Sequence, residues 1–158
     1  MAIGQSLLGL RLPAHSRIGV FQEPDVDWVC SMLGVWRAEH TYVPLEPTQG
    51  IRRLADVAKE AKLAALLIHD PTVPLVSQLA LNDAIKVVNV STLPVSHLGK
   101  ATIVSNHKPN DEAMIIYTSG STGVPKVCGP NSGICILLSF PAAKLSRFRA
   151  FRYPTVSL

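Results

Sequence analysis

Short apolar runs alternate with longer amphipathic stretches along the first ninety residues of the chain. The short runs favour buried strands, whereas the longer stretches place apolar residues at helical spacing. The pattern predicts strands over 17–21, 63–68 and 85–90, a β segment over 42–47, and helices over 25–37, 49–61 and 73–81. A weaker leucine pattern predicts the end of a further helix within residues 1–12.

The two longer helices carry apolar residues on one side. On the first helix the residues at helical spacing are Val26, Val29, Cys30, Leu33 and Trp36. On the second helix they are Ile51, Leu54, Val57 and Ala58. We expect each helix to bury this side in the core, and Asp25 is a suitable N-cap for the first one.

Strands that alternate with helices predict parallel β-α-β units with right-handed crossovers, and therefore a layered α/β sheet. In such sheets ligands bind beyond the carboxyl ends of the strands. Residues 91–110 are polar and predict a connecting loop, with a short strand at 102–104. The apolar residues before Thr118 read as another strand, so the loop that follows Tyr117 is expected at the carboxyl edge.

The formal charge of +4 comes from one end of the chain. No acidic residue follows Lys126, whereas four basic ones do: Lys144, Arg147, Arg149 and Arg152. Because the charges before that point cancel, the body of the chain gives no reason to expect nucleic-acid binding. We expect a domain over residues 1–126 and an unrelated, basic, poorly ordered tail over 127–158.

Cysteine content favours a reducing, intracellular setting. Cys30, Cys128 and Cys135 match no zinc spacing, and an odd number argues against a disulfide framework. The N-terminal residues do not resemble a signal peptide, and no apolar run reaches the ~18 residues of a membrane span. We therefore expect a cytoplasmic chain; its 158 residues, 47% of them hydrophobic, suffice for one folded domain.

The stretch with the clearest chemistry is Ile115-Ile-Tyr-Thr-Ser-Gly-Ser-Thr-Gly-Val-Pro-Lys126. Glycines let backbone N–H groups approach an anion, hydroxyls add donors, and a lysine adds positive charge. This combination predicts a phosphate-binding loop. It is not a Walker A loop, because Gly123 is followed by Val-Pro-Lys rather than by Lys and a hydroxyl residue. The candidate phosphate-binding residues are Thr118, Ser119, Gly120, Ser121, Thr122, Gly123 and Lys126.

The order Tyr-Thr-Ser-Gly-Ser-Thr-Gly-x-Pro-Lys over residues 117–126 resembles the signature of the AMP-forming ligases. That family includes acyl-CoA synthetases, adenylation domains of nonribosomal peptide synthetases, and luciferases. A second stretch, residues 36–47 followed by Arg53, resembles another core motif of the family, although Glu39 and His40 replace a glycine pair. We expect this second motif to serve turn geometry and core packing rather than catalysis.

The resemblance implies that a carboxylic acid attacks the α-phosphate of ATP, giving an acyl-adenylate and pyrophosphate. A thiol of coenzyme A or of a carrier phosphopantetheine then takes the acyl group. The implied cofactors are therefore ATP with Mg²⁺ and one of these thiol acceptors. The loop from Thr118 to Lys126 would hold the β- and γ-phosphates, where its charge lowers the cost of releasing pyrophosphate. No catalytic residue and no metal ligand of the protein are assigned.

The resemblance covers about residues 17–126 and ends abruptly after Lys126. The family's ribose-binding aspartate and adenylation lysine have no counterparts, so we expect negligible adenylation by these 158 residues alone. Three hypotheses stay open: a ligase fragment, a non-catalytic nucleotide-binding remnant, or a basic interaction protein acting through residues 144–152. A partial sheet is expected to leave apolar surface uncovered and to favour self-association.

Other polar and aromatic residues suit structural roles. Asp25 and Asp27 suit helix capping, Tyr117 is expected to pack at the end of its strand, and Trp28 and Trp36 are expected in the core. The histidines are scattered without metal-ligand spacing, and we expect solvated or loop positions for all of them. They are His15, His40, His69, His97 and His107.

Overall fold

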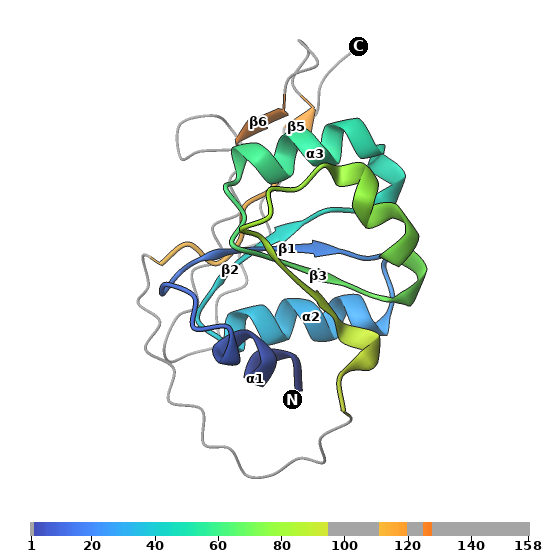
Figure 1. Ribbon diagram of the computed structural model, residues 1–158. Coiled ribbons are helices and arrows are strands. Elements are labelled where there is room, and N and C mark those ends of the chain that lie inside the picture. The colour runs from blue at the N-terminus through green and yellow to red at the C-terminus, as the bar shows by residue number, and fades with distance from the viewer. Residues whose placement is uncertain (1, 95–110, 120–124, 128–158) are drawn as a thin grey trace, which may run out of the picture.

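The framework of the protein is a parallel sheet with helices on both faces (Figure 1). The computed structural model describes residues 2–94, 111–119 and 125–127. Four parallel strands lie in the order β2-β1-β3-β4. They are β1 (Arg17–Phe21), β2 (Thr41–Pro44), β3 (Ala65–Ile68) and β4 (Lys86–Asn89). The four strands predicted within residues 17–90 and the predicted layered α/β class are confirmed, although the second strand ends at Pro44 rather than at residue 47.

Helices cover the two faces of this sheet (Figure 1). On one face lie α1 (Ala2–Gly9) and α2 (Val26–Arg37). On the other lie α3 (Ile51–Glu60) and the 3-10 helix η2 (Asp70–Leu79). Successive strand residues point to opposite faces, so Val20 joins the core cluster under α2 and Phe21 the one under α3. Two shorter 3-10 turns, η1 (Pro47–Gln49) and η3 (Val90–Thr92), precede α3 and follow β4.

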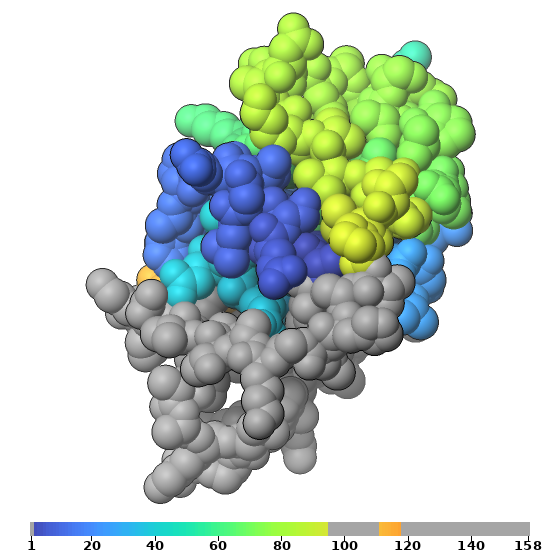
Figure 2. Space-filling view, turned by 60° about the horizontal axis from the view of Figure 1, so that its bottom comes forward, coloured from blue at the N-terminus to red at the C-terminus, as the bar shows by residue number. Residues whose placement is uncertain are grey.

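Helices α1 and α2 approach each other closely at two glycines. A Cβ atom on Gly34 would lie 2.6 Å from Cγ2 of Ile3, and one on Gly4 would lie 3.3 Å from the carbonyl O of Gly34. Helix α1 also packs against the segment after β4, since Leu7 and Val90 belong to one buried cluster. Figure 2 shows α1, in dark blue, beside this yellow segment.

The side of α2 that faces the core differs from the one predicted. Val26 is 77% exposed, Leu33 is 42% exposed, and Cys30 is exposed, so the prediction that they are buried is wrong. The buried residues of α2 are instead Ser31, Gly34 and Val35. Apolar residues occur on more than one side of this helix, and the side with small residues lets α1 come close.

The helix predicted over 73–81 is the 3-10 helix η2, which begins earlier and ends at Leu79. Pro74 lies inside it and has no backbone N–H, so the hydrogen-bond ladder of an α-helix cannot be completed. The strand predicted at 102–104 and the tail from residue 128 onward lie outside the described residues. Within the described ranges, none of the helices has the length and apolar character needed to cross a membrane.

Candidate functional site

The segment that leads to the predicted loop continues the sheet beside β2. Met114 forms a parallel bridge with Tyr42, whose N–H donates to the carbonyl O of Ala113 at 3.0 Å. The Ile115 N–H donates in turn to the carbonyl O of Tyr42 at 2.9 Å. Because this pairing is parallel, the chain arrives at Tyr117 on the carboxyl edge of the sheet. The expected position of the loop is therefore confirmed for the residues that enter it.

Side chains from α2 and β2 add hydrogen bonds to this entry segment, residues 112–117. The Thr41 hydroxyl donates to the carbonyl O of Glu112 at 2.7 Å. The Trp36 Nε1–H donates to the carbonyl O of Ala113 at 2.8 Å. The Trp36 ring also meets Tyr42 edge to face, with 6.3 Å between ring centroids. Trp36 thus has the core role expected of it and also fixes the entry segment.

The two ends of the predicted loop are paired as an antiparallel hairpin. Strands β5 (Tyr117–Ser119) and β6 (Pro125–Val127) place Thr118 opposite Lys126 and Ser119 opposite Pro125. The structure thereby brings three of the predicted phosphate-binding residues together, Thr118, Ser119 and Lys126. The other four, Gly120, Ser121, Thr122 and Gly123, lie outside the described residues.

Tyr117 anchors the start of the hairpin by packing. Its side chain is 8% exposed and belongs to the core cluster under α3. Burial raises the pKa of the Tyr117 phenol, and the nearby Glu60 raises it further, so the hydroxyl stays protonated at neutral pH. This agrees with the packing role expected for the residue.

Two arginines connect the entry segment to the two ends of α3. At the first turn of the helix, Nη2 of Arg53 donates to the carbonyl O of Tyr117 at 2.9 Å. At the other end, Nε of Arg17 donates to a Glu112 carboxylate oxygen at 3.2 Å, and its Nη1 donates to the carbonyl O of Ala61 at 3.3 Å. The sequence pattern does not predict the contact of Arg53 with Tyr117. The only hint in the sequence is that Arg53 follows the second motif.

Two of the histidines, His40 and His69, are buried within loops. Both lie in loops, which is one of the two positions expected of them, but their side chains are buried, with 4% of His40 and 1% of His69 exposed. Burial lowers the pKa of His40, and the charge of nearby His15 lowers it further, while Glu39 opposes the shift. The His40 ring is therefore neutral at physiological pH.

His69 also belongs to a cluster with two aspartates at the carboxyl ends of β1 and β3. Each residue offers an atom that could bind a metal ion, and these atoms lie within 4.8 Å of one another. Yet Nε2 of His69 accepts the N–H of Glu23, and its Nδ1 lies 3.4 Å from Oδ2 of Asp25. Asp25 also caps α2 as predicted, accepting the Trp28 N–H at 2.9 Å, and both aspartates, Asp25 and Asp27, are exposed. The contacts within the chain account for the cluster, and we assign it no ion.

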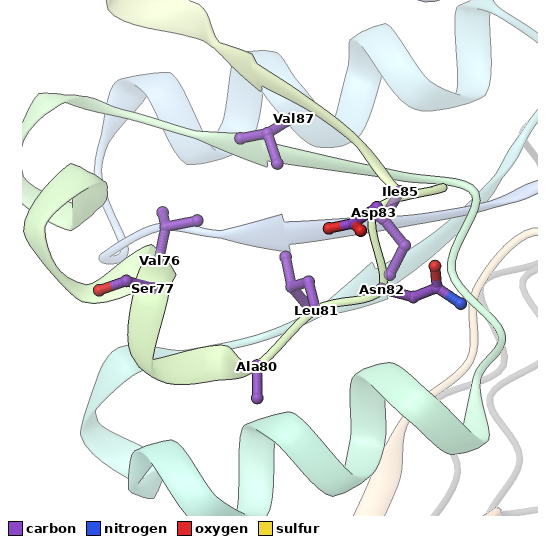
Figure 3. Close-up of a pocket in the computed structure, with 8 residues that line it drawn as sticks. All are labelled: Val76, Ser77, Ala80, Leu81, Asn82, Asp83, Ile85 and Val87. Carbon is purple, nitrogen blue, oxygen red and sulfur yellow. The ribbon is translucent and has the colours of Figure 1, made fainter.

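An open hollow of about 410 Å³ lies between η2 and β4. Figure 3 shows the residues that line it, which come from η2, from residues 80–85 and from Val87 of β4. Asp83 is the one carboxylate among these lining residues. The entry segment pairs with β2, whereas β4 is the opposite edge of the four-stranded sheet. The hollow therefore lies at the opposite edge of the sheet from the entry segment.

These observations define a layered α/β domain in which the chain reaches the carboxyl edge of the sheet at Tyr117 and the antiparallel strands β5 and β6 bound the glycine- and hydroxyl-rich stretch. The chain belongs to the AMP-binding enzyme family, whose sequence model matches residues 1–129. The resemblance read from the two motifs is thus confirmed, and the match begins earlier than residue 17.

Similar proteins support the same assignment. Over 126 residues the chain is 62% identical to the hybrid PKS-NRPS synthetase ucsA of Acremonium sp, covering 80% of this chain and 3% of that protein. Over 110 residues it is 42% identical to the synthetase mpsA of Macrophomina phaseolina, covering 70% and 3%. A structure from a study of fatty acyl-adenylate ligases of E. coli and L. pneumophila has a TM-score of 0.65 and 26% identity, covering 80% of this chain and 23% of that one. The chain spans about 3% of the length of these curated relatives.

Proposed function

We propose that the hairpin loop from Thr118 to Lys126 holds the β- and γ-phosphates of ATP in a reaction that activates a carboxylic acid as an acyl-adenylate. The observation that carries this proposal is the pairing of Thr118 with Lys126 at the carboxyl edge of the sheet. The pairing sets the one lysine of the loop opposite its first hydroxyl residue. Membership of the AMP-binding enzyme family supports the same reaction class.

The donor set of the loop suits phosphate oxygens. It offers backbone N–H groups, hydroxyls and one ammonium group, and it contains no carboxylate. Mg²⁺ would therefore be bound mainly by the phosphate oxygens, with no carboxylate ligand from the loop. As the acid attacks the α-phosphate, negative charge develops on the departing pyrophosphate, and donors already aimed at that charge lower the barrier.

The relatives bear on the thiol acceptor, whereas two solved neighbours carry different acyl groups and support no single acid. One solved neighbour is a nonribosomal peptide synthetase in an alpha-methyl-L-serine-AMP bound form, with a TM-score of 0.66 and 21% identity. Another is the Klebsiella oxytoca NpsA N-terminal subdomain in complex with 3-hydroxybenzoyl-AMSN. The hybrid synthetases among the relatives favour a carrier phosphopantetheine over coenzyme A as the thiol that accepts the acyl group.

The 158 residues alone are expected to bind ATP weakly and to adenylate negligibly. The chain corresponds to 23% of the solved ligase chain described above, and a phosphate loop by itself holds only one end of the nucleotide. Robust ATP–pyrophosphate exchange by the purified chain would contradict this expectation.

The test of the proposal is ATP binding by the purified chain, measured by calorimetry or equilibrium dialysis. Loss of a charge-assisted contact to phosphate predicts that Lys126→Ala weakens binding about tenfold or more. Lys86→Ala is the matched control, because Lys86 is exposed on β4 at the other edge of the sheet. No binding by the unaltered chain, or equal weakening by both substitutions, would refute the proposal.

A further inference from the structure

We propose that Arg53 is a positioning residue that fixes the point at which the chain enters the phosphate loop. The inference rests on the proposed function of that loop. It assigns a role to the arginine of the second motif beyond the turn geometry and core packing expected from its sequence. The role is carried by a contact between residues that lie 64 positions apart.

The contact of Arg53 falls on the last peptide unit before the predicted binding residues. Its Nη2 donates to the carbonyl O of Tyr117 at 2.9 Å. This oxygen and the N–H of Thr118 belong to one planar peptide unit, so holding the oxygen also fixes the direction of that N–H. Thr118 is the first residue of the loop that we propose holds phosphate.

The guanidinium is itself held in place. Its Nε donates to Oε1 of Gln49 at 3.4 Å, so the head group has partners on two sides. Arg53 lies in the first turn of α3, and the next residue, Leu54, is 1% exposed in the core. Core packing thus fixes the helix, and Arg53 connects the helix to the loop.

A planar guanidinium can make these two contacts at once, whereas a lysine ammonium is a point charge without the same fork geometry. Arg53→Lys therefore keeps the positive charge beside the loop but loses the paired contacts. Arg53→Gln removes the charge as well. Comparison of the two separates a positioning role from a purely electrostatic one.

The experiment uses the 158-residue chain with inorganic pyrophosphate as the probe, and the dissociation constant is obtained from NMR titration of backbone amides. We expect Arg53→Lys and Arg53→Gln each to raise the dissociation constant by up to about tenfold, the limit reached when the whole free energy of one charge-assisted hydrogen bond serves to order the loop entrance for binding. Arg52→Lys and Arg52→Gln are matched controls, because Arg52 is the exposed neighbour on the same helix. They should change the constant less than about twofold.

A second measurement, made without ligand, tests the contact itself. The carbonyl ¹³C shift of Tyr117 should move in both Arg53 variants and stay unchanged in both Arg52 variants, while the shifts of core residues such as Leu66 are preserved. An unfolded variant would lose the core shifts, so preserved core shifts in Arg53→Lys separate positioning from loss of fold.

Two results would overturn the inference while leaving the proposed function intact: Arg53→Lys binds pyrophosphate as tightly as the unaltered chain, or the Tyr117 carbonyl shift is unchanged in both variants. A different result, in which the unaltered chain does not respond to pyrophosphate, refutes the proposed function, and the inference with it.

Discussion

The entry segment gives the most specific stability prediction, because its hydrogen bonds to α2 and β2 are individually defined. Trp36→Phe removes the indole N–H that donates to the carbonyl O of Ala113 at 2.8 Å. That oxygen keeps a second donor, the N–H of Tyr42 at 3.0 Å. The carbonyl is therefore not left unpaired, and the cost should be the net value of one hydrogen bond, about 1 kcal/mol.

The ring exchange adds a smaller cost. The centroids of Trp36 and Tyr42 lie 6.3 Å apart with an interplanar angle of 74°, and a phenyl ring keeps part of this edge contact. Loss of the remainder contributes up to about 1 kcal/mol. We therefore expect the free energy of unfolding to fall by about 1–2 kcal/mol, measured by urea denaturation.

Hydrogen exchange locates where this stability is lost. The N–H of Ile115 donates to the carbonyl O of Tyr42, so it reports on detachment of the entry segment. In Trp36→Phe its exchange should accelerate about fivefold to thirtyfold, the factor that corresponds to a loss of about 1–2 kcal/mol. Trp28→Phe is the control, because Trp28 makes a similar edge contact with Tyr42 at 6.4 Å but has no hydrogen bond to the segment among the described residues. Unchanged exchange at Ile115 in Trp36→Phe, or an equal acceleration there in Trp28→Phe, would refute the reasoning.

Three further substitutions test other parts of the account. Gly34→Ala should lower the free energy of unfolding by about 1–3 kcal/mol in urea, because its Cβ would lie 2.6 Å from Cγ2 of Ile3. Leu33→Glu should reduce self-association in sedimentation velocity, because it places a charge on the exposed apolar side of α2. The pKa of His40 is lower in the folded protein than its value of 6.5 in the unfolded chain, so the unfolded chain binds the proton more tightly. The free energy of unfolding should therefore be highest above pH 6.5 and should fall as the pH drops through the folded pKa. His40→Gln should flatten this dependence in urea titrations at several pH values.

Controls make each outcome decisive. Gly9→Ala should not destabilise the protein, because a Cβ there meets nothing within 4 Å, so equal losses at Gly9 and Gly34 would contradict the close approach of α1 and α2. Val73→Glu, at a side chain 45% exposed on η2, should leave association unchanged if α2 provides the contact surface. An unaltered pH dependence in His40→Gln would show that another group controls stability below pH 6.5.

The strands and helices could be predicted because local pattern determines them. Short apolar runs mark β1, β3 and β4, and Asp25 marks the start of α2, since each signal depends on neighbouring residues alone. The orientation of α2 could not be predicted in this way. Both of its sides carry apolar residues, and the close approach at Gly34 depends on where α1 lies.

In the candidate site, too, local sequence predicts some features, whereas others depend on contacts that only the folded chain creates. The order of residues over 117–126 predicts the loop and its family, because that order is itself the signal. The contact of Arg53 with Tyr117 could not be predicted, since it joins residues that only the folded sheet brings together. Likewise, His69 is buried because the ends of β1 and β3 meet around it, which its loop composition does not indicate.

Whether the chain binds phosphate at the hairpin loop can be tested with a map of the backbone amides by NMR. Inorganic pyrophosphate would be added to the unaltered 158-residue chain, and the shift of every assigned amide would be followed. The largest changes are expected within residues 117–127. Changes centred instead on the Asp25–His69 cluster or on the hollow beside β4, or no changes at all, would contradict phosphate binding at the hairpin loop.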